Sequence, residues 1–124
     1  MWVICLKGET KLIGSIGFWH TVPEHHRAEL GYILHPDFWN QGIVTEALQA
    51  VLKYGFEKMK LHSVEASVNP ENVASIRVLE KHGFVREAYF REDYFYDGKF
   101  YDSAVYCLLS RDYFGKWPGD RARD

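Results

Sequence analysis

A single glycine, Gly42, stands where an extended segment turns into a helix-like run, directly after Asn40 and Gln41. The start of a helix carries unpaired backbone N–H groups and the positive end of the helix macrodipole. A phosphate group satisfies both, and glycine lets the backbone approach it closely. Residues 40–45 are therefore a candidate cradle for a pyrophosphate. The alternative is ordinary turn chemistry at a strand-to-helix corner, which needs no ligand.

The residues on either side of this corner predict a strand, a helix and a second strand. RAELGYILH (27–35) is typical of a strand and ends before Pro36. From 41 to about 58, apolar residues recur at helical spacing, and 62–68 alternates in the manner of a strand. We expect a parallel crossover here, because strand–helix–strand units of this kind pair in parallel.

The remaining segments predict two hairpins and a second helix. Segments 2–7 and 11–20 are strand-like and are joined by a short turn, and ENVASIRVLEKHGF (71–84) is a helix with a glycine stop. The aromatic segment 85–110 is two long strands around Asp97-Gly98, a strong hairpin signal. This order of elements predicts an α+β domain around a mixed sheet.

Composition bounds the class of protein. The 124 residues are 47% hydrophobic and 26% charged with a net charge of −2, which is typical of one globular domain and gives little support to nucleic-acid binding. The sequence shows no signal peptide and no apolar run of membrane-spanning length, so we expect a cytoplasmic protein. Cys5 and Cys107 lie in apolar strand-like runs and are expected to be buried free thiols, although a disulfide stays open.

Two further groups of side chains favour structural roles. His20, His25 and His26 lack the spacing of a metal site, so we expect solvated loop histidines and no bound metal. The aromatic stripe could stack nucleic-acid bases but has little basic interleaving. We expect sheet core and a dimer surface from its members, Tyr89, Phe90, Tyr94, Phe95, Tyr96, Phe100 and Tyr101.

The residues around the corner carry a resemblance to a known family. AELGYILHPDFWNQGIVTEAL (28–48) resembles the acetyl-coenzyme A motif of the GNAT N-acetyltransferase superfamily, whose loop runs Gln/Arg-x-x-Gly-x-Gly/Ala. It looks most like the RimJ/RimL branch, and NPENVASIRVLEKHGF (69–84) is similar to the second motif of that branch. The C-terminal part has the branch's Gly-Phe, Asp-Gly and Leu-Leu-x-Arg-Asp-Tyr landmarks. The resemblance runs in order over residues 2–114, so we expect a GNAT domain in 1–114 and a polar tail in 115–124.

The resemblance implies a fold, a reaction and a cosubstrate. The GNAT fold is a mixed, mostly antiparallel sheet with a splayed parallel strand pair and flanking helices. The reaction moves an acetyl group from acetyl-coenzyme A to a primary amine, and within this branch the expected acceptor is a protein N-terminal α-amine. The residues expected to bind acetyl-coenzyme A are Ile33, Leu34 and His35 through their backbone, the loop residues Asn40, Gln41, Gly42, Ile43, Val44 and Thr45, and Asn72.

Two side chains are candidates for proton transfer. Glu29, on the strand that leads to the loop, aligns with the strand glutamate that is the base in some superfamily members; the alternative is a surface carboxylate paired with Arg27 or a histidine. Many members place a tyrosine acid where this chain has Leu79, and Ser75 is the substitute that the branch suggests. The alternative for Asn72 and Ser75 is helix capping.

The sequence also departs from the family pattern. Trp39 and Asn40 replace frequent loop residues, and Val44 puts a branched side chain where Gly or Ala is usual. The family's first strand and two helices, which help to wall the acceptor site, have no counterpart before segment 2–7. We therefore expect an exposed sheet edge that invites a homodimer. A fragment, a non-catalytic domain that binds coenzyme A or a protein partner, and a small-amine acceptor such as a polyamine or an aminoglycoside stay open as alternatives.

Overall fold

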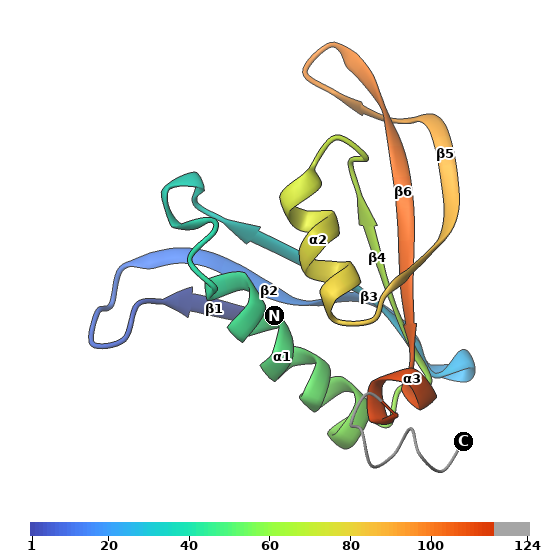
Figure 1. Cartoon of the computed structure of the whole chain (residues 1–124), viewed down its shortest axis with the longest axis horizontal. Coiled ribbons are helices and arrows are strands. Elements are labelled where there is room, and N and C mark those ends of the chain that lie inside the picture. Colours follow the sequence, from blue (N-terminus) through green and yellow to red (C-terminus); the bar gives the residue numbers. More distant parts are fainter. Residues whose placement is uncertain (116–124) are drawn as a thin grey trace.

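Six strands form one sheet in the order β1-β2-β3-β4-β6-β5 in the computed structural model, which describes residues 1–115 (Figure 1). The strands are β1 (Trp2–Cys5), β2 (Leu12–Val22), β3 (Arg27–Leu34), β4 (Ser63–Val68), β5 (Val85–Tyr96) and β6 (Lys99–Leu109). The helices are α1 (Ile43–Lys53), α2 (Val73–Lys81) and α3 (Ser110–Phe114), with a π-helical turn η3 (Tyr54–Lys58) and two 3-10 turns, η1 (Pro23–His25) and η2 (Pro36–Phe38). The predicted α+β fold and its order of elements are confirmed, whereas the predicted tail from 116 onward lies outside the described residues.

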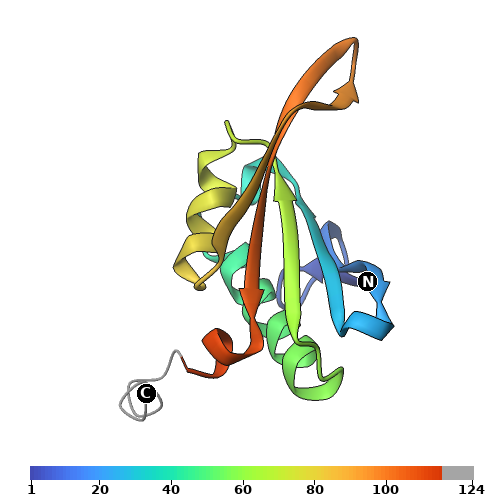
Figure 2. The same ribbon diagram turned by 90° about the vertical axis from the view of Figure 1, so that its right-hand side faces the viewer.

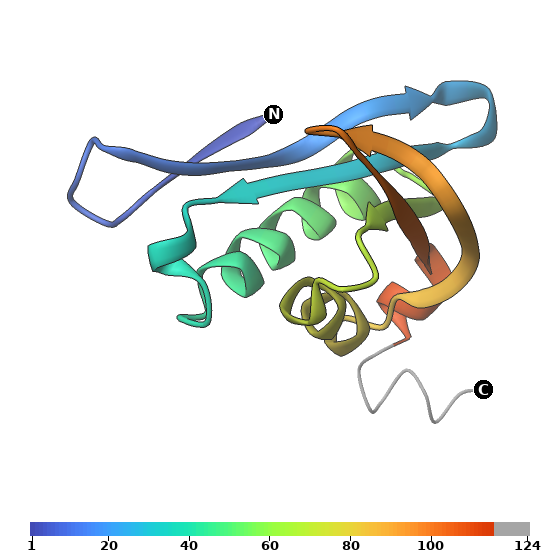
Figure 3. The same cartoon turned by 90° about the horizontal axis from the view of Figure 1, so that it is seen from above.

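Helices α1 and α2 cover the same face of the sheet (Figure 3). The periodicity of α1 puts Leu48, Val51 and Leu52 against that face, and each such side chain contributes about 1.5–3 kcal/mol when fully buried. Every second residue of each strand points toward these helices, including Leu30 of β3 and Val64 of β4. The core therefore lies between the sheet and the two helices. We refer to this side as the helix-covered face and to the other side as the open face.

The parallel pair β3–β4 opens into a V. Pairing joins Arg27 to Ser63 and continues only as far as Leu30 and Ala66. Beyond that point β3 keeps its bonds to β2 as far as Leu34, and β4 keeps its bonds to β6 as far as Val68. The two strands thus share one end and part at the other, which confirms the splayed pair that the resemblance implied.

The aromatic hairpin is the region where the prediction of sheet core is wrong. Pairing of β4 with β6 ends at Ala104, so within residues 1–115 the outer part of β5–β6 has no third strand to pair with. This arm projects beyond the sheet (Figure 2). Its aromatic side chains are exposed or half-exposed, and Phe95 retains 61% of its accessible surface.

Two smaller expectations also need correction. Cys5 is exposed rather than buried, because β1 is the edge strand of the sheet, and Cys107 is only half-buried. Both cysteines are free thiols, as expected. Segment 85–110 was expected to end as a strand, but Ser110 begins the short helix α3, whose Tyr113 ring stacks on Phe56 at 4.7 Å between centroids. This packing covers the end of the core beside η3, the turn that follows α1.

Candidate active site

The corner before α1 has the backbone geometry of an anion cradle. Gly42 is the N-cap of α1 with φ of 78°, and Asn40 is also left-handed with φ of 65°. No side chain among the described residues caps this helix start. The amide of Gln41 turns back instead and donates to the Asp37 carbonyl at 3.0 Å. The first-turn N–H groups are therefore left for a ligand or for solvent.

A cavity of about 280 Å³ lies between this corner and α2. Asn40, Gly42 and Thr45 line it from the corner. Arg77 and Lys81 line it from α2, where a spacing of four residues puts both cations on one side of the helix. Sequence reading missed these two residues, although their spacing and sign were a usable signal. The corner thus combines N–H donors with two positive charges, which suits a diphosphate.

The branched side chain of Val44, which departs from the family pattern, packs into the core beside the corner. It is 5% exposed and packs with Ile13 and Leu34 in a small core cluster beside the corner. Only part of its surface borders the cavity. Its branched side chain is therefore absorbed by the core rather than directed at a ligand.

The backbone of Ile33, Leu34 and His35 runs along the opening of the V. The side chain of Ile33 is exposed on the open face, whereas Leu34 is buried on the helix-covered face, so a ligand in the V meets main chain here. Two of these groups already have partners. Trp39 Nε1 donates to the Leu34 carbonyl at 3.2 Å, and His35 N donates to Ile13 O at 2.8 Å. An amide N–H of a ligand in the V can bond to the Leu34 carbonyl only by sharing it with the Trp39 indole or by displacing the indole.

Asn72 and Ser75 open α2. Asn72 is its N-cap and accepts from the Ser75 N–H through Oδ1 at 3.1 Å, so the capping interpretation holds for that oxygen. The Ser75 hydroxyl is hydrogen-bonded to the hydroxyl of Tyr32 on β3. Burial raises the pKa of the Tyr32 phenol, and the bond to Ser75 offsets only part of that rise. The sequence marked Tyr32 merely as a strand residue, yet it is the one hydroxyl of β3 on the helix-covered face.

Glu29 lies on the open face in a second cavity of about 350 Å³, which it shares with Trp19, Tyr32 and Ile33. Its carboxylate lies 3.8 Å from His20 Nδ1, so the predicted alternative of a histidine partner is realised. His20 belongs to β2 rather than to a loop. His25 is the last residue of η1 and His26 is its C-cap, and both are exposed.

Glu65 of β4 is the direct register neighbour of Glu29. Burial raises the pKa of Glu65, and the hydrogen bond and negative charge of Glu29 raise it further, against the opposing charges of Arg27 and His20. A carboxyl group whose pKa is raised is thus next to the predicted base.

Trp19 is a further residue that sequence reading missed. It is the extra residue of a β-bulge between Phe18 and His20, and such bulges re-aim side chains. Its indole lies against Gly31, where a Cβ would come within 2.9 Å of the ring. Trp19 remains 64% exposed beside Glu29, so it offers an open aromatic face in the same cavity.

The structure does not bring the two predicted proton-transfer residues onto one surface. Strand alternation puts Glu29 on the open face, whereas Ser75 is buried on the helix-covered face. The cavity that holds Glu29 also reaches Tyr32 on β3 and Ser67 on β4, at the mouth of the V. The two residues can therefore act on one molecule only if it lies in the V.

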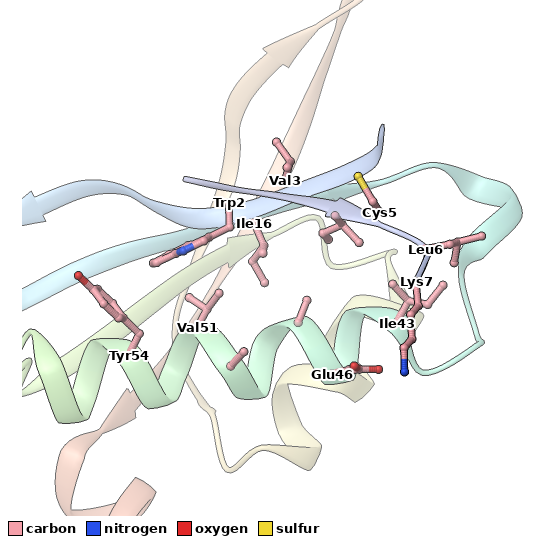
Figure 4. Close-up of a pocket in the computed structure, with 13 residues that line it drawn as sticks. Trp2, Val3, Cys5, Leu6, Lys7, Ile16, Ile43, Glu46, Val51 and Tyr54 are labelled. Carbon is pink, nitrogen blue, oxygen red and sulfur yellow. The ribbon is translucent and has the colours of Figure 1, made fainter. Parts of the chain in front are cut away.

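A larger cavity of about 730 Å³ lies elsewhere, between β1 and α1 (Figure 4). Trp2 and Ile16 point toward Val51 and Tyr54 across it, and Lys7 and Glu46 lie near one end (Figure 4). Of the residues expected to bind the cosubstrate, Ile43 alone lines this cavity. Its lining is mostly apolar side chains, so it lacks the chemistry of a transfer site.

Residues 1–115 contain no cluster of three or more His, Cys, Asp or Glu side chains placed to hold a metal ion. Over the same range, no helix has the length and apolarity needed to span a membrane.

Comparison with known proteins identifies the family. The family model described as "Acetyltransferase (GNAT) domain" matches residues 1–85. The chain belongs to the GNAT acetyltransferase family. Members of this family use acetyl-coenzyme A as cosubstrate, and the GNAT fold accounts for the mixed sheet, the V between β3 and β4, and the corner at Gly42.

Relatives of the chain are longer than the chain itself. The uncharacterized N-acetyltransferase YnaD of Bacillus subtilis is 36% identical over 89% of this chain and 64% of its own length. A GNAT acetyltransferase structure from Bacillus anthracis is 41% identical with a TM-score of 0.76, covering 87% of this chain and 64% of that one. A spermidine N-acetyltransferase from Vibrio cholerae is 25% identical with a TM-score of 0.81, covering 89% and 65%. The chain thus spans less than two-thirds of the length of these GNAT proteins.

Proposed function

We propose that this GNAT domain transfers an acetyl group from acetyl-coenzyme A to a primary amine. The observation that carries the proposal is the placement of three features along one V. An uncapped helix start at Gly42 faces Arg77 and Lys81, Ser75 lies beside β3, and Glu29 lies on the far side of the same opening. A thioester lying in the V meets all three, with its diphosphate at the corner.

The residues of the V divide the chemistry. Glu29 accepts a proton from the incoming amine, directly or through a water molecule, so that the neutral nitrogen can attack the thioester carbon. A backbone N–H along Ile33–His35 donates to the developing oxyanion. When the C–S bond breaks, the thiolate takes the proton of the Ser75 hydroxyl, and that proton of Ser75 is then replaced. The nitrogen of the adduct loses its second proton to solvent, and the acetylated amine and coenzyme A leave. Asn72 contributes its side-chain amide N–H groups to the pantetheine arm, since its Oδ1 already caps α2.

We propose a protein N-terminal α-amine as the first acceptor class, in line with the resemblance to the RimJ/RimL branch. An α-amine with a pKa near 8 needs about 1.4 kcal/mol to lose its proton at pH 7, whereas a lysine amine with a pKa of about 10.4 needs about 5 kcal/mol. A single carboxylate base is sufficient for the easier case.

A small polyamine is the second acceptor class. It is favoured by the similarity to the Vibrio cholerae spermidine N-acetyltransferase. It is also favoured by the second carboxyl group, Glu65, next to Glu29, and by the open face of Trp19, because cations bind to carboxylates and to indole faces. A polyamine would place one amine at Glu29 and a second ammonium against these groups.

Calorimetric titration with acetyl-coenzyme A, followed by a thiol-release assay over a panel of peptides, polyamines and aminoglycosides, tests the proposal. The proposal predicts that acetyl-coenzyme A binds and that coenzyme A is released only when an acceptor is present. The class of amine with the fastest release is then the acceptor class. Binding without release for any acceptor supports the alternative of a non-catalytic domain that holds coenzyme A. Absence of binding contradicts both.

We also propose that two copies associate through the free edge of β1. An edge strand presents unpaired backbone groups, and the exposed side chains of Trp2 and Val3 lie on this one. Sedimentation equilibrium of the wild type and of Val3→Pro tests this: the proposal predicts a dimer that Val3→Pro converts to a monomer, and a monomeric wild type contradicts it.

A further inference from the structure

Ser75 is a polar side chain buried at the start of α2, with 2% of its surface exposed. Its hydroxyl is not left to solvent, because it is hydrogen-bonded to the Tyr32 hydroxyl. Tyr32 lies two residues beyond Leu30, where β3 parts from β4, and Ser75 lies in the first turn of α2. The hydroxyl pair therefore joins β3 to α2 where the V opens.

We propose that Tyr32 is the positioning residue and the proton source behind Ser75, so that the two hydroxyls form one relay to the departing sulfur. This inference rests on the proposed acetyl transfer. As the C–S bond of the tetrahedral intermediate breaks, the thiolate takes the Ser75 proton while Ser75 takes the Tyr32 proton. The resulting phenolate regains a proton from solvent, and the nitrogen of the adduct releases its second proton to solvent. The one net proton set free is then the one that Glu29 removed from the ammonium.

Relative acid strength explains why a second hydroxyl is needed. A thiol leaving group has a pKa near 8.5 and a phenol a pKa near 10, whereas an aliphatic hydroxyl is a far weaker acid than either. A serine that loses its proton alone would form an alkoxide inside a protein core, which is costly. A serine that is reprotonated by tyrosine in the same step never carries that charge.

The surroundings of Tyr32 keep its proton in place and hold the pair at the mouth of the V. Burial keeps the pKa of the phenol above its ordinary value, so the proton is retained at neutral and mildly alkaline pH. The ring of Tyr32 also lies 6.3 Å from that of Trp39, whose indole holds the Leu34 carbonyl at the corner. The relay is therefore held between the phosphate corner and α2, on the path that the proposed cosubstrate follows.

A double-mutant cycle tests the relay. Ser75→Ala and Tyr32→Phe are each expected to lower kcat by about 10²-fold, the lower end of the range for general acid catalysis, because each interrupts the same proton transfer. The double variant is expected to be no slower than either single variant, since a relay can be broken only once. KM for acetyl-coenzyme A is expected to stay within about twofold in all three, because the diphosphate corner is untouched.

A matched control and the melting temperature separate the relay from mere loss of a hydrogen bond. Tyr89→Phe removes a phenol that donates to Asp102 at 2.5 Å on the hairpin arm, and it is expected to leave kcat unchanged. The relay is overturned if the losses of kcat multiply in the double variant, or if they follow a fall in melting temperature. In either case the proposed acetyl transfer still stands, because the wild type turns over. A wild type that binds no acetyl-coenzyme A and releases no thiol overturns both.

Discussion

The two faces of the sheet hold the two halves of the proposed reaction in very different ways. On the helix-covered face, the corner, α2 and the Tyr32–Ser75 pair are tied to buried core residues such as Leu34 and Leu79. On the open face, Glu29, Glu65 and Trp19 lie on strands that no helix of residues 1–115 covers on that side (Figure 3). The cosubstrate half is thus fixed by packing, whereas the acceptor half depends on the strand register alone.

This contrast explains how one GNAT scaffold can accept different amines. The groups that would bind a diphosphate and a thioester are backbone N–H groups and buried hydroxyls, which the fold positions whatever the acceptor. The groups that would meet the amine are exposed or half-buried side chains outside the core clusters. Changes at the corner of the helix-covered face should therefore alter affinity for acetyl-coenzyme A, and changes at the Tyr32–Ser75 pair should alter turnover. Changes on the open face should alter turnover or the amine KM.

Loss of the base is the largest effect expected on the open face. Glu29→Gln removes the proton acceptor but keeps size and register, so kcat is expected to fall by about 10²-fold while the dissociation constant for acetyl-coenzyme A is unchanged. Steady-state kinetics and calorimetry measure the two quantities. Unchanged turnover would show that Glu29 is only a surface partner of His20.

Changes at the corner should weaken acetyl-coenzyme A binding and have little effect on kcat. Gly42→Ala puts a side chain at φ of 78° without any steric contact within 4 Å, so its cost is purely one of backbone conformation. Arg77→Ala removes one cation from the cavity. Each is expected to weaken acetyl-coenzyme A binding by about tenfold, and the Arg77 effect should shrink at high salt. Lys53→Ala, at the other end of α1, is the control, and an equal loss in that variant would contradict a local diphosphate site.

A smaller effect is expected at Trp19. Trp19→Leu removes the aromatic face but keeps an apolar side chain, so KM for a cationic acceptor is expected to rise about threefold with kcat and cosubstrate affinity retained. Initial-rate measurements with a polyamine and with an uncharged-side-chain peptide compare the two acceptor classes. An equal rise of KM for both acceptors would mean that the indole shapes the cavity and does not bind the cation.

Glu65 should affect stability more than activity. Its pKa is raised in the folded state above the value of 4.5, so folding favours its protonated form. This contribution is complete below about pH 4.5 and is lost as pH rises through the folded pKa. Glu65→Gln is therefore expected to raise the melting temperature at pH 8, with the gain vanishing near pH 4. A gain that is independent of pH would point to packing instead.

Periodicity and motif spacing predicted most of the helix-covered face. The run of apolar residues in α1, the glycine at the corner and the glycine stop of α2 each carry a local physical signal, and all three elements formed where expected. The bounds differed at the end of α1, where the predicted helix continues as the π-helical turn η3.

Features that depend on strands distant in sequence were not predictable in the same way. The β-bulge at Trp19, the pairing of Glu29 with Glu65 and the Tyr32–Ser75 bond arise only when separate segments meet in register. The exposure of the aromatic arm likewise follows from where β4 ends, which the arm's own alternating sequence does not encode. Aromatic content alone therefore indicated a core that the topology does not provide.

A crystal structure with bound coenzyme A tests the central claim most directly. The diphosphate is expected within hydrogen-bond distance, about 3 Å, of the backbone nitrogens of residues 42–45, with Arg77 or Lys81 beside it and the sulfur next to Ser75. Coenzyme A bound in the apolar cavity between β1 and α1, with the corner at Gly42 left to solvent, would contradict the account.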